Sequence, residues 1–178
     1  MSVPCVLVRV PDHQLDAALA DPDEADALFA ALEGGDDGDA DPPFEWTDIG
    51  KSFDAIHFVL DPARRSGRMG EPTDGLGGRL IYGTHSRPDE WAEFYEPYGV
   101  EGYSRPADVQ ALVAAMAELD FAAALSAAAQ SLAAAEADET VYAYGSDEYV
   151  QWGYGELRAF YKAAAFEGMA VITFIPEG

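Results

Sequence analysis

The sequence predicts a single α+β domain, in which a small mixed sheet is packed by about five helices around a central buried helix, residues 48–61. Three observations support this fold class. Segments rich in branched apolar residues lie near both ends of the chain, at residues 3–10 and 169–175, so the N- and C-terminal strands are expected to share the sheet. Several segments between them place apolar residues at helical spacing. A length of 178 residues suits one hydrophobic core, so residues 1–178 are expected to form one domain.

The first predicted elements are a strand and two helices. Residues 3–10 alternate and branch as a strand does, and Pro11 ends the segment. Asp12 is expected to cap a first helix, which breaks at Asp21-Pro22. A second short helix ends at Gly34-Gly35, and its apolar positions are Leu28, Phe29 and Leu32.

The region between Arg9 and Lys51 contains thirteen Asp and Glu residues and no Lys or Arg. Its centre predicts a solvated acidic loop. The candidate partner-binding carboxylates of this loop are Asp36, Asp37, Asp39 and Asp41. A calcium loop of the EF-hand type would begin at Asp37, but its sixth position needs a positive φ and is occupied by Pro42, whose φ is fixed at about −65°. The pattern therefore argues against calcium.

The central helix is predicted from the densest apolar pattern in the chain. Its main apolar positions recur at spacings of four, three and four residues, which places them on one face: Ile49, Phe53, Ile56 and Leu60. Other apolar residues cover most of the remaining surface, so the helix should be enclosed nearly all round. Asp48 is expected to act as the N-cap, and Pro62 cannot continue the helix.

The middle of the chain gives weaker signals. Residues 64–78 are rich in Gly, Pro and Arg and predict an irregular loop, and Gly75–Gly78 lacks the spacing of a phosphate-binding motif. Leu80-Ile81-Tyr82 is expected to form a short strand. An aromatic run follows, which could form a binding surface: Trp91, Phe94, Tyr95, Tyr98 and Tyr103. The first four also match helical spacing, which favours the core as their place.

The last third predicts three helices and a closing strand. Ser104, with Pro106 behind it, is expected to open the first of these helices, and an alanine-rich helix follows from Leu119 to Glu136. Ser146 should cap a long helix that stops at Gly168. Residues 169–175 form the closing strand.

Three segments resemble a known family. Residues 48–60 read D-I-G-K-S-F and then H-F-V-L, residues 103–109 read Y-S-R-P-A-D-V, and residues 157–161 read L-R-A-F-Y before the terminal apolar strand. Together they are similar, in the same order, to the YfbM-like family of small bacterial proteins. The resemblance implies a fold and a bacterial origin. That family has no established activity, so the resemblance implies no mechanism.

Composition excludes several classes of partner and site. A net charge of −23 repels phosphate backbones and anionic membrane surfaces, so neither nucleic acid nor membrane is expected as a partner. The N-terminus lacks the basic region and cleavage site of a signal peptide, and we expect a cytoplasmic protein. Cys5 is the single cysteine, and its apolar neighbours predict a buried structural thiol.

The sequence predicts no catalytic residue, no metal ligand and no cofactor. The three histidines have no metal-binding spacing, and His57 on the buried helix is expected to make a structural hydrogen bond. Our leading hypothesis is a non-catalytic acidic module that binds a basic protein partner, as immunity proteins do. The alternative is an enzyme or small-ligand binder with a pocket near His57, Tyr82 and Gly75–Gly78. Acidity that reflects only genomic background on a domain of unrelated role is a third reading.

Overall fold

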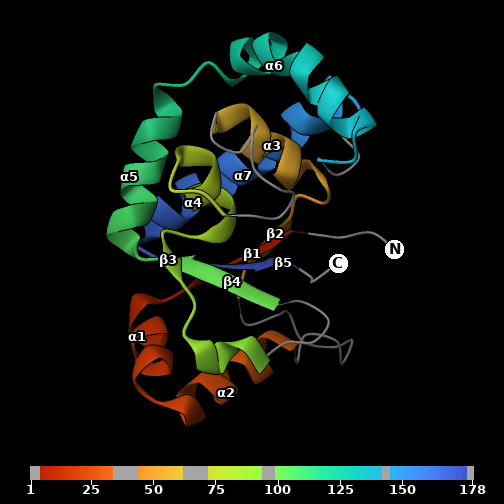
Figure 1. Ribbon diagram of the computed structural model, residues 1–178. Helices are drawn as coiled ribbons and strands as arrows, with labels where there is room; N and C mark the ends of the chain where they lie inside the picture. Colours follow the sequence, from red (N-terminus) through yellow and green to blue (C-terminus); the bar gives the residue numbers. More distant parts are fainter. Residues whose placement is uncertain (1–4, 34–43, 62–71, 94–98, 142–144, 176–178) are drawn as a thin grey trace, which may run out of the picture.

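The computed structural model describes residues 5–33, 44–61, 72–93, 99–141 and 145–175 (Figure 1). A five-stranded sheet crosses the middle of the molecule in the order β2-β1-β5-β4-β3. Two helices near the N-terminus cover one face of this sheet, and the later helices cover the other (Figure 1). The α+β class predicted from the sequence is confirmed.

The sheet is antiparallel at every strand pair in the described residues. The prediction of a mixed sheet was wrong in this respect. Side-chain alternation is the same in parallel and antiparallel strands, so the sequence pattern carries no information on strand direction. The strands are β1 Val6–Val10, β2 Trp46–Asp48, β3 His85–Ser86, β4 Gly99–Ser104 and β5 Ala170–Ile175.

The N- and C-terminal strands share the sheet, as predicted, and the structure shows that they pair directly. β5 lies between β1 and β4 at the centre of the sheet, and all six of its residues are buried. Alternate residues enter two separate hydrophobic clusters: Ile172 and Phe174 pack toward the N-terminal helices, and Val171 and Ile175 pack toward the later helices. A strand buried on both faces reads as a continuous apolar run, which is how this segment reads.

Seven α-helices and one short 3₁₀ helix lie in the described residues, where about five helices were predicted. One face of the sheet carries α1 Asp12–Ala20, α2 Pro22–Glu33 and the 3₁₀ helix η3 Asp89–Glu93. The other face carries α3 Ser52–Leu60, α4 Leu76–Tyr82, α5 Pro106–Ala117, α6 Phe121–Ala137 and α7 Asp147–Glu167.

The central helix is α3, and it is enclosed as predicted. Eight of its nine residues are buried, and it contacts α4, α6 and α7. It begins at Ser52 rather than at Asp48, because Asp48 ends β2 and pairs with Val6. The Asp48 carboxylate accepts the Gly50 N–H at 2.7 Å, and Gly50 turns the chain at φ 55° before the helix begins.

The segment Leu80-Ile81-Tyr82 is helical, so the predicted strand there was wrong. It forms the last turn of α4, which begins at Leu76 in the segment predicted to be an irregular loop. Three apolar residues fit a strand and a buried helical turn equally well, and here contact with α3 decides. A Cβ on Gly77 would lie only 2.9 Å from the His57 carbonyl oxygen, so glycine permits the close approach of the two helices.

The aromatic run divides between different elements. Trp91 is buried in η3, and Tyr103 lies on β4. The Trp91 ring packs 5.2 Å from Phe29 of α2, measured between ring centroids, which confirms the core role for this residue. Phe94, Tyr95 and Tyr98 lie outside the described residues.

The predicted signals at the ends of α7 are confirmed. The Ser146 hydroxyl accepts the Tyr149 N–H at 3.2 Å, and Gly168 ends the helix in the left-handed conformation at φ 68°. Helix α5, by contrast, begins after Arg105 rather than at Ser104, which belongs to β4.

Among the described residues, none of the helices taken singly has both the length and the apolar character required to traverse a bilayer. α5 and α6 together meet those two criteria, but the chain bends by 80° between them.

Candidate functional site

The predicted pocket residues His57 and Tyr82 lie together in the core between α3 and α4. Their ring centroids are 5.3 Å apart and the rings meet at 66°, an edge-to-face contact. His57 is fully buried and Tyr82 is 5% exposed. The two residues therefore lie next to each other, as the sequence-based prediction had them, but they are packed in the core and do not line an open surface.

A hydrogen-bonded chain holds the His57 ring in place. The Thr73 hydroxyl donates to the Asp61 carboxylate, one helical turn beyond His57. The single hydroxyl proton is used in that bond, so the His57 Nε2–H must be the donor to Thr73 Oγ1, at 2.7 Å. This geometry places a proton on Nε2 and ties the segment before α4 to the end of α3.

Two glycines allow the backbone at the start of α4 to pack closely against Asp61 and Thr73 of this network. A Cβ on Gly75 would collide with the Asp61 carboxylate, and a Cβ on Gly78 would collide with the Thr73 backbone. The Gly75–Gly78 segment therefore packs against the His57 network, which accounts for its glycine content without a phosphate ligand.

The loop acids Asp36, Asp37, Asp39 and Asp41 lie outside the described residues. The acids that precede them lie on α1, on α2 and at the junction between the two helices. Arg105 forms ion pairs with both α1 acids, with its guanidinium 2.7 Å from Asp16 and 3.6 Å from Asp12. Four exposed acids follow and make no ion pair within the described parts of the chain: Asp21, which joins the two helices, and Asp23, Glu24 and Asp26 of α2.

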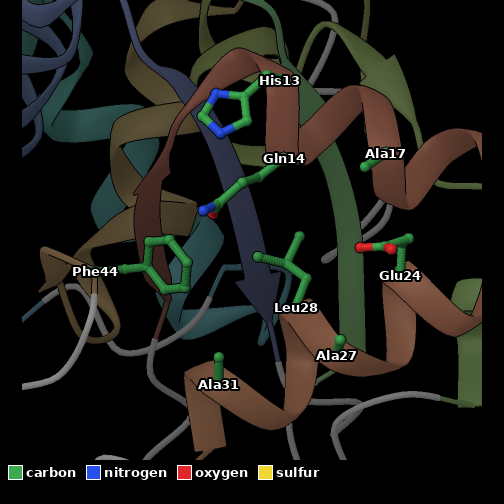
Figure 2. A pocket seen from close by; sticks show the side chains of 8 residues that line it. All are labelled: His13, Gln14, Ala17, Glu24, Ala27, Leu28, Ala31 and Phe44. Carbon is green, nitrogen blue, oxygen red and sulfur yellow. The ribbon is translucent and has the colours of Figure 1, made fainter.

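A hollow of about 280 Å³ lies between α1, α2 and Phe44 (Figure 2). Its wall is mainly apolar and formed by Ala17, Ala27, Leu28, Ala31 and Phe44. Polar groups stand around it on His13, Gln14 and Glu24. Figure 2 shows the Glu24 carboxylate directed toward the hollow and the Gln14 amide between His13 and Phe44.

The Gln14 side-chain oxygen is buried and has no hydrogen-bond partner among the described residues. A buried acceptor without a donor is costly, because the group has lost its water. A ligand with an N–H donor would satisfy it. The hollow therefore combines an apolar wall, a buried acceptor and an exposed carboxylate.

This hollow was not predicted from the sequence. Its lining comes from three segments of the chain. The sequence feature that most nearly marks the hollow is the alanines of α1 and α2, and alanine is common in helices because of its helix propensity alone. Only the packing of these two helices against each other shows that Ala17, Ala27 and Ala31 leave space between them.

The single cysteine is buried, as predicted. Cys5 is fully enclosed in the larger hydrophobic cluster, and burial raises the pKa of its thiol, with the negative charge of Asp48 adding to the effect. A thiol in this setting stays protonated at neutral pH, so it is a poor nucleophile. Within the residues that the structure describes, there is no group of three or more His, Cys, Asp or Glu side chains placed to hold a metal ion.

Comparisons with known proteins identify a family without a known activity. Residues 1–174 match the family described as "Domain of unknown function (DUF1877)". The fold is similar to a solved structure described as a protein of unknown function, YfbM from Escherichia coli, with a TM-score of 0.63 and 15% sequence identity. That similarity covers 98% of this chain and 99% of YfbM. No curated protein matches the sequence. The match over almost the whole chain, together with the shared fold, shows that this protein belongs to the DUF1877 family.

Proposed function

We propose that this protein is a non-catalytic binding module that receives a basic segment of a protein partner on the α1–α2 surface. The observation that supports it most directly is the hollow beside Glu24, which lies in the part of the chain between Arg9 and Lys51 that contains no Lys or Arg. Charge, shape and an available acceptor coincide there.

The hollow suits a Lys or Arg side chain from the partner. Such side chains carry a long aliphatic stem and a charged end, so the stem packs on apolar surface while the end meets polar groups. The stem would lie against Leu28 and Phe44. The cationic end would donate to the Gln14 oxygen and pair with the Glu24 carboxylate.

The charge of the whole chain assists the encounter with such a partner. A net charge of −23 attracts a basic protein over a distance and raises the rate of association. Asp36, Asp37, Asp39 and Asp41 directly follow α2 in the sequence and extend the acidic region. Neutralisation of a basic toxin, the role of an immunity protein, requires this kind of surface. The proposal places the protein in the bacterial cytoplasm, with neither nucleic acid nor membrane as its partner.

A labelled hexa-arginine peptide provides a direct test by fluorescence anisotropy. Glu24→Lys should weaken binding by about tenfold, because it replaces the attractive carboxylate at the hollow with a like charge. Glu118→Lys is the matched control, since it makes the same change in net charge at an exposed position at the end of α5. Equal losses in the two variants would show that only overall charge matters and would refute a site at the hollow.

A second pair of variants tests shape without changing charge. Ala27→Phe should fill part of the hollow and lower the affinity for the same peptide. Ala122→Phe, on an exposed position of α6, should leave the affinity unchanged. If both variants bind as the wild type does, the peptide binds elsewhere.

The alternative, a small-molecule site near His57, Tyr82 and Gly75–Gly78, stays a prediction. A thermal-shift screen against metabolites addresses it, because a ligand at a hundredfold its Kd stabilises the folded protein by about 2.7 kcal/mol.

A further inference from the structure

The exposed face of α7 carries large apolar side chains at both ends. Three large apolar side chains are exposed among the described residues, and two of them lie on this helix: Trp152, which is 47% exposed, and Phe166, which is 92% exposed. They are separated by fourteen residues, which in an α-helix corresponds to about 21 Å and an angular offset of only about 40°. The two aromatic side chains therefore belong to one face.

Small residues occupy that face between the two aromatic side chains. Gly155 and Ala159 are exposed and Ala163 is half-buried. A Cβ on Gly155 would meet no atom within 4 Å, so nothing in the described residues covers this part of the helix. The opposite face of α7 is already packed in the core through Val150, Leu157 and Tyr161. The exposed face is therefore not needed for folding of the monomer.

Two opposite charges flank the centre of the face. Glu156 lies three residues before Ala159 and Lys162 lies three residues after it, and both are exposed. Neither makes an ion pair within the described part of the chain. The positions three and four residues away on the helix offer no opposite charge to either: Trp152, Gly153, Ala159 and Phe160 for Glu156, and Arg158, Ala159, Ala165 and Phe166 for Lys162.

The pattern is symmetric about Ala159. Reversing the helix about this residue exchanges Trp152 with Phe166, Gly155 with Ala163, and Glu156 with Lys162. A face of this kind is complementary to an antiparallel copy of itself, which is the requirement for a two-fold symmetric interface. A parallel copy would instead oppose Glu156 to Glu156.

We infer that α7 mediates homodimerisation through an antiparallel helix pair centred on Ala159. Each Glu156 pairs with Lys162 of the second copy, and the aromatic side chains at the ends cover the small residues between them. The face is locally neutral, which matters because two chains of charge −23 repel each other. A contact along one helix of about 21 Å falls in the small class of interfaces, below about 1,200 Å², so the dimer should be weak and its Kd on the order of 10 μM.

Sedimentation velocity from about 5 to 500 μM measures the equilibrium across a Kd of this order. The wild type should shift from monomer to dimer as its concentration rises. Glu156→Lys and Lys162→Glu, each alone, should weaken the homodimer at least about tenfold, because each opposes like charges twice. Glu118→Lys, which changes net charge as Glu156→Lys does, should leave dimerisation intact. A monomeric wild type at all concentrations would overturn the inference, as would a dimer that Glu156→Lys leaves unchanged.

Mixing the two single variants tests the antiparallel geometry. In the mixed pair, positions 156 and 162 are both lysine on the Glu156→Lys chain and both glutamate on the Lys162→Glu chain, so both contacts become attractive. The mixture should therefore dimerise although each variant alone does not, and the double variant Glu156→Lys/Lys162→Glu in one chain should restore the homodimer. Failure of both rescues would overturn the proposed pairing.

A cysteine at the symmetry centre gives an independent measurement. Ala159→Cys should form an intermolecular disulfide on mild oxidation, because the two copies of residue 159 meet at the axis, whereas native Cys5 is fully buried. Ala133→Cys, on an exposed position of α6, is the control. Equal cross-linking of the two variants would contradict the inference.

Discussion

The ring of His57 on α3 meets the ring of Tyr82 on α4 edge to face, with 5.3 Å between the ring centroids. The Nε2–H of the same histidine donates to Thr73 Oγ1 at 2.7 Å. One buried imidazole thus joins two helices and the segment that connects them. This arrangement favours a structural role for His57, as the sequence pattern predicted.

Replacement of His57 should lower stability. His57→Gln retains an N–H donor but loses the ring contact with Tyr82, so we expect the free energy of unfolding to fall by about 2 kcal/mol. Urea denaturation measures it. Binding of the hexa-arginine peptide to the folded variant should not change, and a loss of binding without a loss of stability would point to a functional role instead.

Two glycine substitutions should have opposite effects. Gly77→Ala should destabilise the protein by about 2 kcal/mol, because the added Cβ lies 2.9 Å from the His57 carbonyl oxygen and forces α3 and α4 apart. Gly155→Ala should instead stabilise it by about 0.5–1 kcal/mol, since the site is open and alanine favours the helix. Thermal unfolding of dilute samples compares the two. A similar change in stability in both variants would contradict the close packing described at Gly77.

The hydroxyl of Ser146 should stabilise the start of α7. Ser146→Ala removes the acceptor of the Tyr149 N–H and should cost about 1 kcal/mol. Ser146→Asp keeps an acceptor and adds a favourable charge at a helix N-terminus, so it should retain the wild-type stability. Chemical denaturation distinguishes the variants, and an unchanged midpoint for Ser146→Ala would argue against the cap.

Stability should fall at alkaline pH because buried acids cannot ionise without cost. Burial raises the pKa of Cys5 and of Tyr161 above their ordinary values. Above about pH 8.5 for Cys and pH 10 for Tyr, the unfolded chain releases protons that the folded chain retains. The unfolded state then binds fewer protons, so stability declines with rising pH by about 1.4 kcal/mol per pH unit for each group.

Two substitutions separate the contributions to this alkaline loss. Cys5→Ala should flatten the decline between about pH 8.5 and pH 10, and Tyr161→Phe should flatten it above about pH 10. Tyr161→Phe also removes a buried hydrogen bond to the Leu80 carbonyl at 2.9 Å, so it should cost about 1 kcal/mol at neutral pH. Urea unfolding at about pH 7, 9 and 10.5 measures both effects. Identical pH profiles for the wild type and both variants would refute the assignment.

Local patterns in the sequence were sufficient for the features that depend on nearby residues. The apolar spacing around Phe53 and Ile56 predicted an enclosed helix, and Ser146 and Gly168 marked both ends of α7. The terminal segments predicted the two strands that pair at the centre of the sheet. Each of these signals arises from helical or strand periodicity, or from a cap within one turn, so the sequence contains it directly.

Other features depend on contacts between distant segments, and only the tertiary structure decided them. Leu80–Tyr82 is helical because Gly77 lets α4 approach α3. The direction of each strand in the sheet depends on the path of the segments between the strands, such as α5 to α7 between the antiparallel neighbours β4 and β5. The hollow beside Glu24 exists because α1 and α2 pack with alanines facing Phe44. The sequence by itself determined which segments are buried and where several of them end. Which buried segments meet, and where they leave space, follows from packing over the whole chain, since one apolar pattern is compatible with many neighbours.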